Sequence, residues 1–361
     1  MMRNFLRLLV IMTLAISVLI GCASTPGKKE RVVFWPDPPE EPRISYIKSY
    51  RTETDFRGKS FFDMIFGVSN IALFSKPYGV YSDGGLIYAT DTASGGVLVY
   101  NPLDKKMRFI MGDKDKLQRP VGVATAADGT VFVSDAKQSK IFGYDNQGKQ
   151  VMTIGSRAQL NNPAGIAINK DLGRLYITDS REHKVFVFSV KGEFLFSFGQ
   201  QGTGDGEFIA PTNVAIDRRN GTVYIVDTLN CRVQVFDKDG KFLRKFGELG
   251  DSPGSFTRPK GIGVDTEGHV YVADAAFDNF QIFDENGQIL MFVGSAGRGP
   301  GRFSLPAGMY VDENDVIYVA DQVNQRIQLF QFLSDKWKKD HPEEYQKILA
   351  PKQEQEKSGE K

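Results

Sequence analysis

The sequence predicts an all-β protein, a six-bladed β-propeller whose ring is closed by an N-terminal strand that completes the last blade. The main observation is an aspartate that ends a short apolar run six times. These residues are Asp91, Asp135, Asp179, Asp227, Asp274 and Asp321. Their spacings of 44, 44, 48, 47 and 47 residues indicate one supersecondary unit repeated along the chain.

Each repeat contains four short runs rich in Val, Ile, Tyr and Phe. In the fourth repeat they cover 211–217, 222–227, 232–237 and 241–247. Asp-x-x-Gly or Asn-Gly turns separate the runs, and such turns supply the positive φ that tight hairpins need. Four antiparallel strands in a repeat of this length predict a propeller blade and not a helical solenoid. A β-sandwich is excluded because its strands would not repeat in sequence.

The last repeat lacks its fourth run, because the chain becomes polar soon after Phe330. The missing strand lies upstream of the first repeat, where 46–50 (Tyr-Ile-Lys-Ser-Tyr) matches 242–246 (Phe-Leu-Arg-Lys-Phe) position for position. We therefore expect the N-terminal strand to close the ring, which would run from 43 to 333. Closure of this kind removes open sheet edges.

The repeat motifs carry a family resemblance. The segments 259–265 (Pro-Lys-Gly-Ile-Gly-Val-Asp), 270–274 (Val-Tyr-Val-Ala-Asp) and 324–330 (Asn-Gln-Arg-Ile-Gln-Leu-Phe) resemble NHL repeats, and the chain resembles NHL-type six-bladed bacterial lipoproteins. The resemblance covers nearly the whole mature chain and implies the fold. It leaves the function open, because NHL proteins include lyases, RNA binders, receptor sensor domains and scaffolds.

Residues 1–22 resemble a bacterial lipoprotein signal peptide. Arg3 and Arg7 precede a 13-residue apolar stretch at 8–20, and 19–22 (Leu-Ile-Gly-Cys) matches a lipobox. We expect Cys22 to be lipidated, although a plain signal peptide with a chance cysteine is the alternative. Ala23 resembles the outer-membrane sorting pattern, which predicts a lipid-anchored envelope protein on the outer membrane, facing the periplasm.

The segments outside the ring are short. Residues 23–42 form a proline-rich tether that Trp35 should pin to the propeller, and 334–361 form a charged tail, disordered or with a short helix at 343–349. The other cysteine, Cys231, should be buried and structural. A net charge of +1 argues against nucleic-acid binding, and we expect a monomer.

The six aspartates could form a ring of metal ligands. However, four of them are followed five residues later by a cation: Lys140, Lys184, Arg232 and Arg326. This spacing favours a scaffold role, with an ion pair between adjacent strands.

The NHL-like lyases and related lactonases imply an enzymatic alternative with a metal at the channel mouth. The three histidines, His183, His269 and His341, cannot occupy equivalent positions there, so a His₃ zinc site is excluded. A calcium site built from scattered Asp and Asn stays open, as in a lactonase-like hydrolase or a lyase. We predict no catalytic residues and no cofactor, with calcium only under this alternative.

The connector 51–76 is longer than the other connectors between blades. Ser60 and Asp63 form a capping-box pattern, and Gly67 is a helix stop. A helix between them would place four apolar side chains on one face: Phe61, Phe62, Ile65 and Phe66. We expect it to be either a lid packed on the rim or a docking face for a partner protein.

The residues beside each blade-opening proline depart from the repeat on one side of the ring. The candidate ligand- or partner-binding residues there are Lys76, Tyr78, Arg119, Arg258 and Lys260. This basic side could receive an anionic ligand or an acidic peptide, against the alternative of solvated surface charge. We therefore predict a scaffold that binds a protein or peptide partner in the cell envelope and contacts the membrane only through its lipid.

Overall fold

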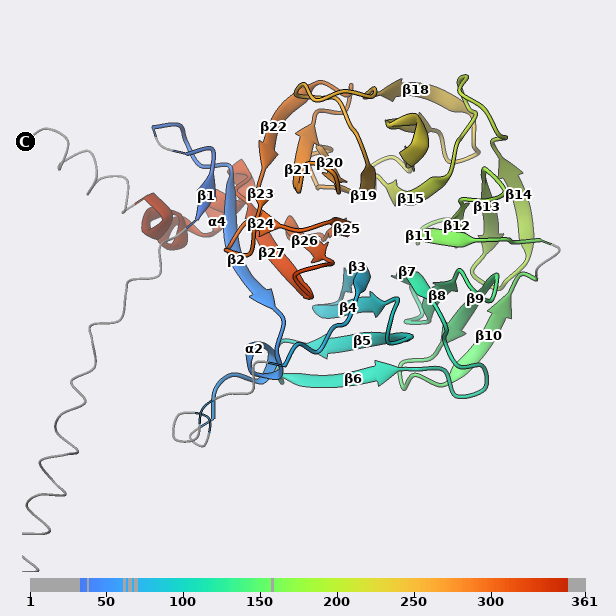
Figure 1. Ribbon diagram of the computed structural model, residues 1–361, viewed down its shortest axis with the longest axis horizontal. Coiled ribbons are helices and arrows are strands. Elements are labelled where there is room, and N and C mark those ends of the chain that lie inside the picture. The colour runs from blue at the N-terminus through green and yellow to red at the C-terminus, as the bar shows by residue number, and fades with distance from the viewer. Residues whose placement is uncertain are drawn as a thin grey trace, which may run out of the picture. The chain divides into compact units, whose positions relative to one another are not determined.

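The computed structural model contains six antiparallel sheets arranged as blades around a central channel (Figure 1). It describes residues 33–37, 39–60, 63, 67, 71–156 and 159–349. The predicted all-β, six-bladed propeller is confirmed. The predicted leader, with Cys22, lies outside the described residues.

Each blade contributes four strands in sequence order from the channel outward. Blades 1 to 3 comprise β3 (Pro77–Asp83), β4 (Leu86–Asp91), β5 (Gly96–Asn101), β6 (Lys106–Ile110); β7 (Pro120–Thr125), β8 (Val131–Asp135), β9 (Lys140–Tyr144), β10 (Gln150–Ile154); β11 (Pro163–Asn169), β12 (Arg174–Asp179), β13 (Lys184–Ser189), β14 (Phe194–Phe198). Blades 4 and 5 comprise β15 (Pro211–Ile216), β16 (Val223–Asp227), β17 (Arg232–Phe236), β18 (Phe242–Phe246); β19 (Pro259–Val264), β20 (Val270–Asp274), β21 (Asn279–Phe283), β22 (Ile289–Val293). Blade 6 comprises β25 (Pro306–Val311), β26 (Val316–Asp321), β27 (Arg326–Phe332) and two N-terminal strands, β2 (Ile44–Tyr50) and β1 (Phe34–Trp35).

Which strands are buried follows from the way neighbouring blades pack face to face around the ring. The middle strands β16 and β17 are buried along their whole length, whereas the outer strand β18 alternates between exposed and covered residues. A middle strand has a neighbouring blade on each face, so both of its side-chain rows become core. This is why the middle runs read as continuous apolar segments.

The closing strand β2 pairs with β27 in the register that the sequence match predicts. Tyr46 lies opposite Phe330 and Tyr50 opposite Ile327, with a bulge between them. In blade 4, Phe242 lies opposite Phe236 with a bulge at the equivalent place. Closure by an N-terminal strand is therefore confirmed. Trp35 of β1 adds to the same blade, where its ring lies 5.8 Å from Phe330, edge to face.

A tight ring of glycines explains the Pro-x-Gly motif that opens the inner strands. A Cβ on Gly79 would lie 2.2 Å from the Val121 carbonyl oxygen of the next blade. The other positions of this kind are Gly122, Gly165, Gly261 and Gly308, and Asn213 takes the place in blade 4. The junction of blades 1 and 2 also has a hydroxyl bridge, because Gly79 N donates to Thr90 Oγ1 at 2.7 Å and Thr90 Oγ1 donates to Val121 O at 2.8 Å.

The carboxylates of the repeated aspartates accept hydrogen bonds from backbone amides of the connectors between blades. Asp91 Oδ2 accepts from the amides of Ser75 and Lys76 at 2.6 and 2.9 Å, and its Oδ1 accepts from the following turn. Equivalent bonds hold the connectors at Asp135, Asp179, Asp227, Asp274 and Asp321. The aspartates are therefore scaffold, because backbone amides occupy their oxygens.

The predicted ion pairs of these aspartates are only half right. Arg232 and Arg326 pair with their aspartates at 2.9 and 2.8 Å. Lys140 and Lys184 lie opposite Asp135 and Asp179 in the ladder but form no ion pair with them within the described chain. The aspartates in those two blades are already satisfied by amides, so the lysine ammonium gains little by leaving solvent; Lys140 Nζ lies over the Phe142 ring.

The long connector begins with a short helix, α2 (Glu53–Arg57), that the sequence did not predict. Phe56 is buried beneath it. Further along, the predicted capping pattern is present: Asp63 N donates to Ser60 Oγ at 3.2 Å, and Ser60 N donates to Asp63 Oδ2 at 2.7 Å. Gly67 has a φ of +84°. The four apolar residues between them (Phe61, Phe62, Ile65, Phe66) lie outside the described residues, so their role stays a prediction.

The C-terminal segment is helical over α4 (Asp335–Asp340) and again at 342–349. The second helix overlaps the one predicted at 343–349, whereas α4 was not predicted. Lys338 Nζ lies 2.6 Å from Glu41 Oε1, and Tyr345 donates to the same oxygen at 2.8 Å, so the two ends of the described chain meet beside blade 6. No helix within the described part is long and apolar enough to cross a membrane.

Cys231 is buried and unpaired, as the sequence suggested. Its thiol donates weakly to the Thr257 carbonyl oxygen, with the sulfur 3.4 Å from that oxygen. Burial raises the pKa of the thiol, and a protonated buried thiol is inert.

Candidate ligand site at the basic channel mouth

The channel has two different mouths because all six inner strands (β3, β7, β11, β15, β19, β25) begin at a proline and run in the same sense (Figure 1). At the proline mouth the connectors arrive from the preceding blades. At the hairpin mouth each inner strand turns back into the second strand of its blade. Sequence reasoning placed the candidate residues at the proline mouth only.

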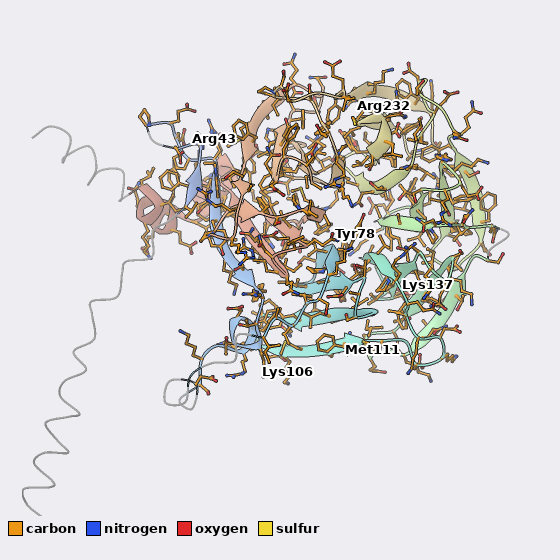
Figure 2. All side chains as sticks on the ribbon, in the orientation of Figure 1. Arg43, Tyr78, Lys106, Met111, Lys137 and Arg232 are labelled. Carbon is orange, nitrogen blue, oxygen red and sulfur yellow. The ribbon has the colours of Figure 1, made fainter. Side chains whose placement is uncertain are left out.

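The structure brings those candidate residues together. Lys260 reaches from blade 5 past the buried Ala307 of blade 6 and places Nζ 5.4 Å from the centre of the Tyr78 ring in blade 1. Tyr78 lies near the centre of the ring in the view of Figure 2. It packs against Val121 and Ala164 of blades 2 and 3, so its ring bridges the inner strands of three blades.

The same mouth carries concentrated positive charge. Arg258 and Lys76 repel the ammonium of Lys260, and Arg119 acts on the phenol of Tyr78. We call Lys76, Tyr78, Arg119, Arg258 and Lys260 together the basic mouth. Within the described residues, none of its four cations forms an ion pair with a carboxylate. Arg119 instead donates to Asn162 Oδ1 at 2.6 Å.

Burial and like charge shift the pKa values of the basic mouth. Burial lowers the pKa of Lys260, and repulsion from Arg258 and Lys76 lowers it further. Burial raises the pKa of Tyr78, which the positive charge of Arg119 opposes. Burial is the main cause of both shifts, and at Lys260 the neighbouring cations add to it; shifted pKa values of this kind are common at functional sites.

Below Tyr78 the channel holds a cavity of about 570 Å³ that continues to the hairpin mouth. Its wall comes from all six inner strands, and Lys170 and Arg218 lie at its far end. Sequence reasoning missed this cavity. The available signal was hairpin length, because 14 residues separate Gly165 from Asp179 but only 12 separate Gly79 from Asp91.

The charges at the hairpin mouth are largely compensated by other groups. Lys170 Nζ lies 2.6 Å from Asp83 Oδ1, reaching from blade 3 to blade 1. Arg218 donates to the Val311 carbonyl oxygen, and its guanidinium lies 5.7 Å from the Tyr310 ring. These two contacts cross the mouth from blades 3 and 4 to blades 1 and 6.

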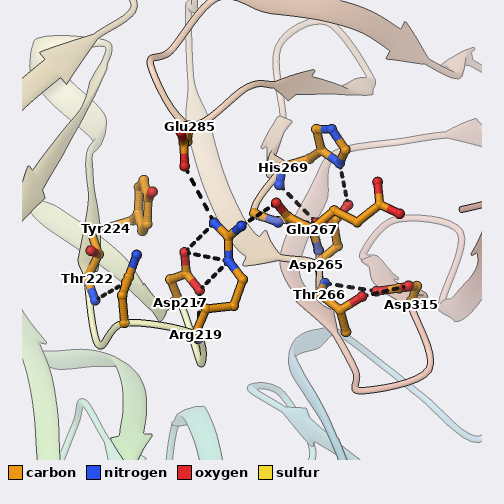
Figure 3. Close-up of polar contacts among 12 residues, drawn as sticks. Asp217, Arg219, Thr222, Tyr224, Asp265, Thr266, Glu267, His269, Glu285 and Asp315 are labelled. Carbon is orange, nitrogen blue, oxygen red and sulfur yellow. Dashed lines mark hydrogen bonds and ion pairs between the residues drawn. The ribbon is translucent and has the colours of Figure 1, made fainter. Parts of the chain in front are cut away.

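A polar cluster that begins at the cavity wall with Asp217 and Arg219 extends across blades 4 to 6 (Figure 3). Arg219 pairs with Asp217 at 2.8 Å and lies 3.7 Å from Glu285. His269 Nδ1 lies 2.8 Å from Asp265 Oδ2, and this hydrogen bond raises the pKa of the imidazole in spite of its burial. At the hairpin mouth Lys170 and Arg219 thus have carboxylate partners, in contrast to the cations of the basic mouth, whereas Arg218 is held by a carbonyl oxygen.

The metal sites of the enzymatic alternative need different ligands, and a calcium site built from Asp and Asn stays a prediction. No group of three or more His, Cys, Asp or Glu within the described chain lies close enough to hold a metal ion. The histidines also lie apart in the fold: His183 Nδ1 accepts from Ala210 N, His269 pairs with Asp265, and His341 stacks on Trp337.

Comparison with known proteins agrees with this architecture. A family model described as a 6-bladed beta-propeller matches residues 158–233, 220–277 and 265–353. A curated relative, the protein SUPPRESSOR OF QUENCHING 1, chloroplastic, from Arabidopsis thaliana, is 30% identical over 140 residues. The match covers 33% of this chain, and the chain spans only 13% of that relative's length.

Solved structures with this fold include enzymes and a binding protein. A catalytically inactive virginiamycin B lyase from Staphylococcus aureus, with quinupristin, has a TM-score of 0.53 at 16% identity and covers 73% of this chain and 97% of its own. A gluconolactonase from Xanthomonas campestris has a TM-score of 0.56 at 16% identity, with 72% and 86% covered. An auxiliary nutrient binding protein from Bacteroides thetaiotaomicron has a TM-score of 0.56 at 15% identity, with 71% and 69% covered. At these identities the likeness concerns the fold alone.

Proposed function

This chain belongs to the six-bladed β-propeller family, and from that premise we propose that it is an envelope binding scaffold that captures an acidic segment of a partner protein at the basic mouth. In this proposal the propeller is an NHL-type ring on a bacterial lipoprotein. Cys22 carries the lipid, and the outer membrane, on its periplasmic side, is the location. Catalysis is not part of the proposal.

One observation carries the proposal: four cations share one mouth without a carboxylate partner in the described chain. Lys260 is half-buried there, and its pKa is lowered by burial and by neighbouring cations. Holding like charges together is unfavourable, so an incoming anion would gain more at this mouth than at isolated surface lysines. At the opposite mouth Lys170 and Arg219 already have carboxylate partners, so an anion would gain less there.

An acidic protein segment suits this arrangement better than a small anion alone. The cations come from blades 1, 2 and 5, so they are spread along one side of the mouth and do not form a single point. Carboxylates spaced along a peptide can contact several of them at once, and arginine binds carboxylates in a bidentate manner. The fold also occurs in a nutrient binding protein, so binding without catalysis is compatible with this architecture.

We predict that neutralising the basic mouth weakens binding of a fluorescent oligoglutamate peptide by at least about tenfold. The test variant combines Lys76→Gln, Arg119→Gln, Arg258→Gln and Lys260→Gln, and fluorescence anisotropy at low and high ionic strength measures the affinity. Wild-type binding should weaken with salt because it is electrostatic.

A matched control separates local from overall charge. It removes four exposed lysines from the outer hairpins, by Lys106→Gln, Lys149→Gln, Lys191→Gln and Lys241→Gln. The net charge changes equally in both variants, so this control should retain nearly wild-type affinity. Equal losses in the two variants would refute a specific site at the basic mouth.

We predict separately that Cys22→Ser moves the protein from the membrane fraction to the soluble fraction. Two or more acyl chains anchor a protein stably, and the variant cannot receive them. Fractionation of cell envelopes followed by immunoblotting measures the change, with Cys231→Ser as the control. Membrane association that persists in Cys22→Ser would show that the lipoprotein assignment is wrong.

A further inference from the structure

Lys260 differs from the lysines that the structure uses for support. Lys170, Lys245 and Lys338 each have a carboxylate oxygen at 2.6 Å. Lys260 has no such partner in the described chain, and its Nζ lies over the face of Tyr78. A half-buried amine at a channel mouth, free of a carboxylate and beside two other cations, is the arrangement that makes a lysine nucleophilic.

We propose that Lys260 Nζ is a reactive amine that condenses reversibly with the carbonyl group of an anionic aldehyde or 2-oxo acid. The proposal rests on the proposed function, because the anionic part of the ligand is held by the same cations that would bind an acidic segment. Arg258 and Lys76 lie near enough to Lys260 to repel its ammonium, and Arg119 lies near the phenol of Tyr78.

The chemistry needs no oxidant or metal. The lone pair of the neutral amine attacks the carbonyl carbon, a C–N bond forms as the C=O π bond opens, and one of the two amine protons moves to the oxygen to give a carbinolamine. Loss of that oxygen as water, with both protons of the amine, leaves an imine between Nζ and the ligand carbon. Hydrolysis reverses every step, so the ligand can be released unchanged.

The environment favours the neutral amine that this reaction requires. Burial and the charges of Arg258 and Lys76 lower the pKa of Lys260 from the ordinary value of 10.5. Each unit of lowering raises the neutral fraction at neutral pH by about tenfold. The Tyr78 ring, whose centre lies 5.4 Å from Nζ, positions the side chain at the mouth, and the ammonium loses its proton to solvent before the amine reacts.

Pyridoxal 5′-phosphate is a suitable probe because it carries an aldehyde and an anion in one small molecule. Full-length protein is incubated with the probe at neutral pH and reduced with borohydride, and modified lysines are mapped by mass spectrometry. We expect Lys260 to be modified at least about tenfold faster than the exposed Lys241, and unlabelled pyridoxine 5′-phosphate, which has no aldehyde, to slow the labelling by competition.

Two further arms decide the outcome. Pyridoxal, which lacks the phosphate, should label Lys260 much more slowly, and Arg258→Gln should slow labelling by pyridoxal 5′-phosphate. Labelling of Lys260 at the rate of Lys241 would overturn the reactive amine; if oligoglutamate still binds in that case, the proposed function survives. Equal labelling by pyridoxal and its phosphate would overturn the anionic character of the ligand.

Discussion

Replacing Arg326 by methionine is expected to destabilise the propeller by about 3–5 kcal/mol, because it leaves a buried carboxylate without its charge partner. Arg326 Nε donates to Asp321 Oδ2 at 2.8 Å, and Asp321 is fully buried. The other guanidinium nitrogens donate to the carbonyl oxygens of Arg298, Gly299 and Arg302 at 2.6–2.9 Å. One substitution therefore removes an ion pair and the bonds that hold the preceding connector.

Equilibrium unfolding in denaturant measures this loss, and blade 2 provides the control. Lys140 occupies the position equivalent to Arg326 but forms no ion pair with Asp135 in the described structure. Lys140→Met should therefore change the free energy of unfolding by less than about 1 kcal/mol. Similar losses in Arg326→Met and Lys140→Met would show that the buried pair does not stabilise the ring as we argue.

The difference between Arg326 and Lys140 also shows how much of the bonding within the propeller could be predicted from the sequence. Spacing alone treated Lys140, Lys184, Arg232 and Arg326 as equivalent, and the ion pairs form only at the two arginines. The reason is the connector before them, because Arg232 also binds the carbonyl oxygens of Thr203, Gly204 and Glu207. A planar guanidinium has enough donors to satisfy a loop and a carboxylate together, and an ammonium does not have that geometry.

The blades and the closing strand were predictable because each depends on local repetition. The two segments that match in sequence, 46–50 and 242–246, also pair in the same register in the structure, with a bulge at the equivalent place. The channel interior was less accessible to sequence reasoning, because it depends on how six inner strands face one another. The basic mouth could be found from residues beside the prolines, whereas the cavity and the crossing contacts of Lys170 and Arg218 involve blades far apart in sequence.

Replacing Gly308 by alanine is expected to destabilise the protein by about 1–3 kcal/mol and to disturb the basic mouth at the same time. A Cβ at this position would lie 2.3 Å from the Tyr78 carbonyl oxygen and 2.9 Å from Gly79 Cα. Both contacts are with backbone, so relief requires the inner strands of blades 6 and 1 to separate. Gly299→Ala is the control, because the nearest atom to its Cβ would be Arg302 Cδ at 3.8 Å.

Gly122→Ala separates the effect on stability from the effect on the mouth. Its Cβ would lie 2.6 Å from the Ala164 carbonyl oxygen at the junction of blades 2 and 3, so thermal unfolding should record a loss of similar size. Tyr78 and the ammonium of Lys260 meet across the junction that contains Gly308, whereas the junction that contains Gly122 affects Tyr78 only through its packing on Val121 and Ala164. Oligoglutamate affinity should therefore fall more in Gly308→Ala than in Gly122→Ala. If both folded variants bind equally well, the position of Tyr78 does not control the basic mouth.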